Sequence, residues 1–410
     1  MASPPTTTTT TTVLIIGAGV GGLILAQGLR KAGLPFMVFE RDDLLDSRLQ
    51  GYRLKVTGDV AAQLRETLPA EVWSLLQRTC AQAVLGETNL NATDAAVRAC
   101  RRGRLPAGVP LPLVADRGVL RKVLMSGIEG RVRFGQSLVA YEELLEPDKD
   151  GSGSSRIRAQ FADGSTAEGV LLVAADGVGS RARRQLLPQV QPVDTGVRCI
   201  YGKSPLGEEL RARYPERHRR CITVVRDETP LLQSIITGRD SPVVMVCEPC
   251  HFSPGDRDRR PDLIPDDYVH WGILFSSSGL GVPDPDLGDD DDAVALALDI
   301  TGEWDPSIRS LIELQDRELT HGMRVLSAPA ALPEWEPSDR VTVLGDAVHV
   351  MSPSGGVGAV AAIHDACLLA GILAQEGHSK VSIGKYERGM REFAKKCIDR
   401  SNEAAVRMLG

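Results

Sequence analysis

The sequence predicts an α/β fold in which a Rossmann-like domain is interrupted along the chain by an inserted β-sheet domain. A short apolar run, a glycine-rich turn and a helical segment follow one another at residues 13–32 and again at residues 341–374, as in the strand–turn–helix units of parallel sheets. Between them, residues 190–326 hold short β-rich runs separated by polar loops, which indicates an antiparallel sheet. The Rossmann-like domain is therefore expected at residues 13–80, 101–189 and 327–380, and the inserted domain at residues 81–100 and 190–326.

The composition is that of a globular protein with a sizeable core. Of the 410 residues, 42% are hydrophobic and 25% are charged, close to the globular average. The net charge of −7 gives no electrostatic indication of nucleic-acid binding, so no nucleic-acid partner is expected. Glycine is enriched, at 41 of 410 residues against a usual share of roughly 7%. The places where these glycines cluster are therefore candidates for backbone that must approach a ligand.

Several features bear on the compartment. Residues 1–12, which end in seven threonines, are expected to form a disordered tail, and they lack the basic and apolar segments of a secretory signal. No run approaches about 18 uninterrupted apolar residues, so no membrane-spanning segment is expected. The eight cysteines are dispersed from Cys80 to Cys397, which suits reduced thiols. Together these features predict a cytoplasmic protein.

The first part of the chain predicts alternating strands and helices. The apolar run Val13–Ile16 is expected to be a buried strand, followed by a helix over 23–32 that Gly33 closes and a strand over 36–39. Residues 58–80 are expected to be helical with a break at Pro69, and residues 116–130 to form another helix.

The middle of the chain is expected to be rich in β-structure. Residues 131–175 predict a β-meander whose turns lie at 148–151 and 163–164 and which ends in an apolar strand over 170–175. The inserted domain is expected to contain strands at 221–225, 231–237, 242–247 and 268–275. The aspartates at 289–292 precede a helix over 293–300 and favour its dipole. They lack the spacing of a calcium loop, and no metal site is predicted. Residues 381–410 are expected to form a C-terminal helix.

The first glycine motif predicts a dinucleotide site. Gly17, Gly19 and Gly22 stand in the G-x-G-x-x-G pattern between a predicted strand and helix, and Glu40 follows at the end of the next strand. In this arrangement the glycines allow a tight turn, approach of a pyrophosphate, and close packing of helix on strand. The acidic residue accepts the hydroxyls of an adenosine ribose. Because Glu40 would repel a 2′-phosphate, NADP is not expected at this position.

Two further motifs also follow predicted strands. Asp176 and Gly177 come after the strand over 170–175, where a simple turn before a helix is the alternative interpretation. Asp346 comes after the strand over 341–344, and a glycine-rich stretch from Pro353 to Gly358 then leads into a helix over 360–374. Ligands of open α/β sheets bind at the carboxyl ends of strands, and a helix N-terminus stabilises negative charge. A reduced flavin ring, which becomes anionic, is such a ligand.

These motifs, in this order, resemble the single-component (class A, aromatic-hydroxylase-like) FAD-dependent monooxygenases over most of the chain. The resemblance implies an FAD-binding domain of this family with an inserted substrate-binding β-sheet domain. It implies cofactor contacts for a set of residues that includes Arg41 near the adenine, Arg117 near the pyrophosphate and ribityl chain, and Arg53 near the isoalloxazine. The full implied set is Gly17, Gly19, Gly22, Glu40, Arg41, Arg53, Arg117, Asp176, Gly177, Asp346, Pro353, Gly356 and Gly358. One position departs from the family pattern: Val360 stands where family members usually carry Asn.

The implied activity is monooxygenation. NADH or NADPH would reduce bound FAD transiently, and O₂ would then form a flavin C4a-hydroperoxide that hydroxylates or epoxidises an electron-rich small molecule, such as an aromatic metabolite of secondary metabolism. The chain lacks a second G-x-G-x-x-G motif for a separate NADPH domain. An FAD-dependent dehydrogenase or oxidase remains an alternative. A halogenase would show a W-x-W-x-x-I segment, whereas Trp335 stands alone. Oligomeric state is not predicted.

No motif selects a catalytic residue. A base that shares the proton of a phenolic or indolic substrate would assist the reaction. The weak candidates are Arg53, Tyr201 and His270, with His321 and Arg324 also in the inserted domain. His349 is expected to order the loop after Asp346. The C-x-x-C-H sequence at 247–251 matches the spacing of c-type haem attachment, but a strand that runs into a turn at Pro249 is the preferred interpretation.

Overall fold

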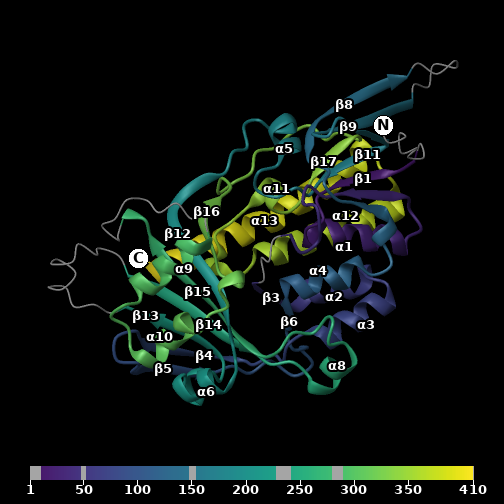
Figure 1. The fold of residues 1–410 in the computed structure, drawn as a ribbon. Coiled ribbons are helices and arrows are strands. Elements are labelled where there is room, and N and C mark those ends of the chain that lie inside the picture. Colours follow the sequence, from purple (N-terminus) through teal and green to yellow (C-terminus); the bar gives the residue numbers. More distant parts are fainter. Residues whose placement is uncertain (1–10, 48–51, 147–153, 228–241, 279–289, 410) are drawn as a thin grey trace.

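The protein is described from a computed structural model, which covers residues 11–47, 52–146, 154–227, 242–278 and 290–409. A parallel sheet with flanking helices and a large antiparallel sheet form two regions, and the long C-terminal helix runs along both (Figure 1). The chain enters the first region, leaves it for the second, and returns to the first before its end. The predicted interruption of one α/β region by a β-sheet region is therefore present.

Five parallel strands form the central sheet, in the order β17-β11-β1-β2-β7. The strands are β1 (Val13–Ile16), β2 (Phe36–Phe39), β7 (Val132–Arg133), β11 (Leu171–Ala174) and β17 (Val341–Val343). Every residue of β1, β11 and β17 is buried, as expected for strands covered on both faces. Because β1, β11 and β17 are neighbours and parallel, the three glycine motifs that follow them meet at one edge of the sheet.

The α/β region also contains helices, of which α1 and α5 pack on the central sheet. The helices are α1 (Val20–Lys31), α2 (Gly58–Thr67), α3 (Ala70–Thr79), α4 (Arg117–Met125), α5 (Arg181–Leu186), α11 (Asp346–His349), α12 (Gly358–Glu376) and α13 (Lys380–Leu409), with short 3₁₀ turns at Glu129–Arg131 and Pro353–Gly355. The predicted break at Pro69 separates α2 from α3. The helix predicted over 116–130 is wrong at its end: α4 stops at Met125, because Gly127 adopts a φ of 77° that ends the helix.

Two small sheets complete the α/β region. An antiparallel meander contains β8 (Leu138–Glu146), β9 (Ser154–Phe161) and β10 (Thr166–Gly169), as predicted from the hairpin signals; the turn expected at 148–151 lies outside the described residues. A two-stranded antiparallel sheet joins β3 (Arg53–Val56) to β6 (Leu113–Asp116). This second sheet faces the inserted region.

The inserted region is built on a seven-stranded sheet in the order β16-β12-β15-β14-β13-β4-β5. Its strands are β4 (Gly86–Asn91), β5 (Val97–Arg102), β12 (Val193–Pro205), β13 (Ile222–Arg226), β14 (Val244–Cys250), β15 (Tyr268–Ser276) and β16 (His321–Ser327). Its helical segments are α6 (Glu208–Arg213), α8 (Pro254–Arg259), α9 (Asp290–Ile300), α10 (Pro306–Glu313) and 3₁₀ turns at Glu216–His218 and Arg317–Leu319. The strand predicted over 231–237 lies outside the described residues.

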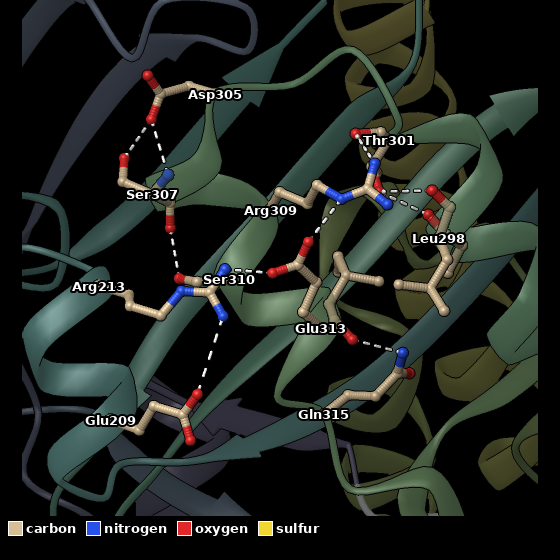
Figure 2. Close-up of polar contacts among 12 residues, drawn as sticks. Glu209, Arg213, Leu298, Thr301, Asp305, Ser307, Arg309, Ser310, Glu313 and Gln315 are labelled. Atoms are coloured by element: carbon tan, nitrogen blue, oxygen red, sulfur yellow. Dashed lines mark hydrogen bonds and ion pairs between the residues drawn. The ribbon is translucent and has the colours of Figure 1, made fainter.

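One face of this sheet is apolar and is covered by helices. Ile200, Trp271 and Ile273 pack there against buried residues of α9 and α10. Figure 2 shows how polar contacts tie these helices together: Glu313 of α10 accepts hydrogen bonds from Arg309, at 2.8 Å, and from Arg213 of α6. This face is thus used for packing, and the opposite face is turned toward the α/β region, where Glu248 of β14 is in an ion pair with Arg53 of β3.

The turn predicted at Pro249 is wrong. Strand β14 continues through Pro249 to Cys250, where Pro249 pairs with Val269 of β15. Proline is tolerated there because pairing with β13 on the other side ends at Cys247, so the missing N–H leaves no partner unsatisfied.

The two long C-terminal helices have different environments. Helix α12 is the one described helix whose length and apolarity would suit a membrane span. It packs closely on α1, however: a Cβ added at Gly28 of α1 would lie 2.6 Å from Cβ of Ala370 of α12. Helix α13 extends to the inserted sheet, where Arg226 of β13 donates a hydrogen bond to the carbonyl of Arg407, at 2.6 Å. Helix α12 is thus a core helix, and α13 connects the two regions.

Candidate cofactor site

A cleft that is open to solvent lies at the carboxyl ends of β1, β2 and β11. Seven of the predicted cofactor residues line it: Gly17, Gly19, Glu40, Arg41, Arg117, Asp176 and Gly177. Its other lining residues include Arg121, Gln136 and Arg181, which the sequence motifs did not select.

The three glycines of the first motif differ in what surrounds them. A Cβ at Gly22 would lie 2.1 Å from the carbonyl oxygen of Gly17, and Gly17 itself has a φ of 109°. Both glycines are therefore required by the fold of the turn. At Gly19, by contrast, no protein atom lies within 4 Å of an added Cβ. Gly19 leaves open space in the cleft lining, where a ligand can approach the backbone.

The N-terminus of α1 points its free N–H groups toward this cleft. Gly19 is the N-cap residue, and no side chain caps the helix. The first N–H groups of an uncapped helix attract anions, helped by the helix dipole. The N-terminus of α1 thus suits an anionic group such as a pyrophosphate.

Glu40 is a buried carboxylate at the end of β2. One of its oxygens accepts a hydrogen bond from the amide of Ala18, at 2.7 Å, and the other accepts one from the amide of Asp42, at 3.1 Å. Because a carboxylate offers about four acceptor positions, two remain for ligand hydroxyls. Arg121 fixes the same turn by donating to the carbonyls of Ala18 and Leu45, at 3.1 and 2.8 Å. No sequence motif pointed to Arg121, which follows Arg117 by one helical turn.

Asp176 lies beside the turn that follows β11. One of its oxygens accepts from the amide of Arg181, at 3.0 Å, and the other is buried without a partner among the described residues. Burial raises the pKa of this carboxyl. The buried Arg183 donates from its guanidinium to the carbonyls of Val178 and Ala347, at 2.8 and 3.1 Å, and so connects this turn to α11. Arg183 was missed because a buried arginine has no periodic signature.

Asp346 begins α11, after Gly345 with a φ of 61°. Its side chain is exposed, yet enough protein surrounds it that burial raises its pKa, against the lowering effects of His349 and Arg117. Because the Asp346 side chain is exposed to solvent and yet surrounded by many protein atoms, it lies in a recess of the protein surface. Because Arg117 also lines the cleft, Asp346 and the cleft belong to one electrostatic region.

Behind Asp346, a buried pair holds the loop. Nε2 of His349 lies 2.6 Å from Oδ2 of Asp365, which also accepts a hydrogen bond from the amide of Gly345, at 3.0 Å. Both side chains are inaccessible to solvent. Burial acts to lower the pKa of His349, but the Asp365 carboxylate outweighs it and the pKa is raised. His349 thus orders the loop as expected, and its partner Asp365 was missed.

The glycine-rich stretch forms a tight loop before α12. Residues 353–355 make a 3₁₀ turn, Gly356 is left-handed with a φ of 61°, and α12 starts at Gly358 without a side-chain cap. The loop is held from behind by α13, since a Cβ at Gly355 would lie 2.9 Å from Cα of Ser401. A second uncapped helix N-terminus is therefore present near Asp346. Val360 lies in the first turn of α12 and packs on the core.

Comparison with known proteins identifies this arrangement. A family model described as "FAD binding domain" matches residues 10–200 and 331–401. The match takes in the strands of the α/β region together with β4, β5 and the start of β12, and the rest of the inserted sheet lies in the gap of the match. The chain belongs to the FAD-dependent monooxygenase family of the aromatic-hydroxylase type.

The relatives of this chain include proteins whose names combine an O-methyltransferase with an FAD-dependent monooxygenase. It is 42% identical to the dual O-methyltransferase/FAD-dependent monooxygenase elcB of Phaeosphaeria nodorum, over 97% of this chain and 44% of that protein. It is 40% identical to the similarly named CTB3 of Cercospora beticola, over 97% of this chain and 46% of that protein. The chain thus spans about half the length of these relatives.

Solved structures show the same fold. A structure from Photorhabdus luminescens subsp. laumondii, named as a FAD containing monooxygenase, superposes with a TM-score of 0.77 at 28% identity, covering 97% of this chain and 98% of the other. Klebsiella pneumoniae HpxO complexed with FAD and uric acid has a TM-score of 0.68 at 20% identity, covering 96% and 87%. At that identity the second match concerns the fold alone.

The described residues fit FAD. The open space over Gly19, the uncapped N-termini of α1 and α12, and the free acceptor positions of Glu40 suit a pyrophosphate, an anionic ring edge and a ribose. The unpartnered oxygen of Asp176 is a further acceptor in the cleft. Gly22, Arg53, Asp346, Pro353, Gly356 and Gly358 do not line the cleft itself. Of these, Gly22 acts through packing, and Asp346 and residues 353–358 form the adjoining loop.

The structure separates the candidates for a base. Arg53 is in an ion pair with Glu248, at 2.8 Å, and His270 is deeply placed on β15. The Tyr201 ring contacts the rings of Tyr52 and His321, at 5.7 and 5.8 Å between centroids. Arg324 of β16 is exposed at the sheet edge. Arg53, Tyr201, His270 and His321 therefore all lie near the boundary of the two regions.

The two cysteines of the C-x-x-C-H segment are buried, and its histidine is paired with a carboxylate. Cys247 and Cys250 are each 1% exposed, and burial raises the pKa of both thiols to about 12. Nδ1 of His251 lies 2.8 Å from a carboxylate oxygen of Asp267. Within the described ranges, no group of His, Cys, Asp and Glu side chains has a metal-binding arrangement.

Replacing Glu40 tests the ribose contact. Glu40→Ala is expected to weaken FAD binding roughly tenfold to a hundredfold, because hydrogen bonds to a charged acceptor contribute about 1.5–3 kcal/mol. Titration of the apoprotein with FAD, followed by flavin fluorescence, measures the change. Glu142→Ala is a matched control, since Glu142 lies exposed on β8 and contacts only Arg158 among the described residues. Equal FAD affinity of the two variants would contradict the assignment.

Proposed function

We propose that the chain is an FAD-dependent monooxygenase that uses NADH or NADPH and O₂ to hydroxylate or epoxidise an aromatic or other electron-rich small molecule. The observation that carries the proposal is the meeting of the three glycine motifs at adjacent strand ends, around a polar-lined cleft. The names of the relatives support the same class of activity. The eight free cysteines suit a reducing, cytoplasmic location.

Each group of the site has a distinct task in this proposal. The N-terminus of α1 and Arg117 hold the pyrophosphate, Glu40 binds the adenosine ribose, and Asp346 accepts a hydrogen bond from the ribityl chain. Bound FAD would supply hydride acceptance from the nicotinamide and transfer of one atom of O₂ to the substrate. The N-terminus of α12 stabilises negative charge on the flavin ring through its free N–H groups.

Spectroscopy and turnover test this proposal. Purified protein incubated with FAD is expected to retain it through gel filtration and to show the visible absorption of oxidised flavin. Anaerobic NADPH or NADH should bleach that absorption, and readmitted oxygen should be consumed. A product that carries one oxygen atom from ¹⁸O₂ supports monooxygenation. Formation of hydrogen peroxide alone, with every aromatic probe, would favour an oxidase, and failure to bind FAD would refute the proposal.

A further inference from the structure

Arginines gather at one end of the inserted sheet, although the whole chain has a net charge of −7. Strand β5, at the lower edge of Figure 1, ends at Arg102, which pairs with Gly86 at the start of β4. A Cβ added at Gly86 would lie 3.4 Å from Cβ of Cys221, so the residue before Cys221 lies at the same end of the sheet. The arginines of these two segments, which we call the basic patch, are Arg101, Arg102, Arg104 and Arg220.

The charges of the basic patch are poorly compensated. Its three arginines at and after the end of β5 are exposed, and within the described part of the chain their side chains have no ion pair or hydrogen bond. Glu87 is the register partner of Arg101, yet its carboxylate accepts a hydrogen bond from Asn89, at 2.9 Å. Arg220 contacts Glu216 only at 4.0 Å, and both side chains are exposed. Such an exposed excess of positive charge attracts an anionic surface.

An apolar loop follows the basic patch in the chain. Residues 105–112 connect β5 to β6, and the amide of Val109 donates to the carbonyl of Pro106, at 3.2 Å, across a turn in which Gly108 has a φ of 83°. Val109 and Leu111 are 43% and 60% exposed. Large apolar side chains that are exposed close together, unlike scattered ones, mark interaction surfaces. The loop therefore adds an apolar surface to the basic one.

The composition of this loop suits the interface of a lipid bilayer. Its prolines have no N–H groups, so fewer backbone donors lose their water when the loop enters the headgroup region. They are Pro106, Pro110 and Pro112. The tip is open to solvent, since no protein atom lies within 4 Å of a Cβ added at Gly108. Beside it, a guanidinium can form two parallel hydrogen bonds to a phosphate, the group that every phospholipid carries.

We infer that the basic patch and the loop of residues 105–112 form a docking surface for a membrane that contains anionic phospholipid. Val109 and Leu111 enter the region between headgroups and acyl chains, and the arginines bind lipid phosphates. The attachment is peripheral and reversible, because it combines a basic surface with a small apolar one. This inference goes beyond the proposed function and does not depend on it.

Co-sedimentation with vesicles tests this docking surface. The full chain, with FAD present, is mixed with vesicles of equal parts phosphatidylcholine and phosphatidylserine, or with vesicles of phosphatidylcholine alone. Binding to the anionic vesicles is expected to be tighter by about tenfold or more. Salt at about 1 M, which shortens the Debye length to about 3 Å, should release the protein from them.

Two matched triple variants separate the basic patch from the net charge of the chain. The patch variant carries Arg101→Gln, Arg102→Gln and Arg104→Gln. It should bind the anionic vesicles about a hundredfold more weakly, since each arginine contributes about fivefold. The control variant removes exposed arginines of α2, α5 and α13 through Arg65→Gln, Arg184→Gln and Arg400→Gln. It loses the same charge and should change binding by less than about twofold, because screening limits distant charges.

Substitutions at Leu111 test whether the loop enters the membrane. The tryptophan of Leu111→Trp should be quenched by vesicles that contain brominated phosphatidylcholine, because the bromine atoms lie among the acyl chains. Val381→Trp is the control, at a residue of α13 that is 77% exposed, and its fluorescence should not change. Leu111→Ser should weaken binding to the anionic vesicles by about tenfold through the loss of apolar burial.

The outcomes separate the two proposals. No sedimentation with either kind of vesicle, equal sedimentation with both, or an equal loss in the two triple variants would overturn the inference. Binding to polyglutamate without binding to vesicles would also overturn it, and would assign the basic patch to an acidic protein. The substituted side chains are exposed, so the variants should keep the wild-type melting temperature. FAD retention and NADPH-dependent oxygen uptake, measured on the same preparations, report on the proposed function independently of vesicle binding.

Discussion

Asp365→Ala is expected to destabilise the protein by about 3–5 kcal/mol, because it leaves a buried partner charge without compensation. Asp365 holds both the His349 imidazole and the amide of Gly345, so its loss also frees the loop that presents Asp346. Urea denaturation monitored by tryptophan fluorescence measures the stability, and FAD titration measures the effect on the loop. Asp399→Ala, which removes an exposed carboxylate paired with Lys395 on α13, is the control and should change stability by less than about 0.5 kcal/mol.

The same pair predicts a dependence of stability on pH. The pKa of His349 is raised in the folded protein above the unfolded value of 6.5, so its contribution is complete below pH 6.5 and is lost as pH rises through the folded pKa. Although burial opposes it, His349 lowers the pKa of Asp365 from 3.8, and that contribution is lost only as pH falls below this value. Wild-type stability relative to His349→Gln should therefore decline above pH 6.5. A difference that stays constant across this range would show that His349 does not become charged on folding.

Substitutions of two glycines of the first motif are expected to have large and different effects on stability and on FAD binding. Gly22→Val places atoms against the Gly17 carbonyl, and Gly19→Val places them in open space in the cleft. Gly22→Val should therefore lose both thermal stability and FAD binding, with a cost to folding of about 3 kcal/mol or more. Gly19→Val should fold with wild-type stability, since its φ of −72° is open to any residue, and lose FAD binding by at least about a hundredfold.

Melting curves and FAD titrations on both variants check this difference. Gly33→Ala is a useful comparison, because its φ of 71° strains alanine at a site away from the cleft. It should lower the melting temperature and leave FAD affinity unchanged. Retention of FAD by Gly19→Val would mean that the pyrophosphate does not approach the backbone there.

Most elements of the α/β region could be predicted from the chain because their signals are local. The strand over 36–39, the break at Pro69 and the strand ends before Gly17, Asp176 and Asp346 all follow from apolar runs next to glycine or proline. The end of α4 was misplaced, because the apolar pattern continues past the left-handed Gly127. The turn at Pro249 was misplaced because the tolerance of proline depends on where the neighbouring strand stops pairing.

Sequence by itself determined the order of the motifs, the acidic residue after β2 and the family of FAD-binding proteins to which they point. Only the tertiary structure decided which residues from distant segments share one environment: His349 with Asp365, Arg183 with the loop of Asp346, and Arg53 with Glu248. The physical reason is that a backbone turn is set by neighbours in the chain, whereas burial, charge compensation and unpartnered atoms depend on what the fold packs beside them.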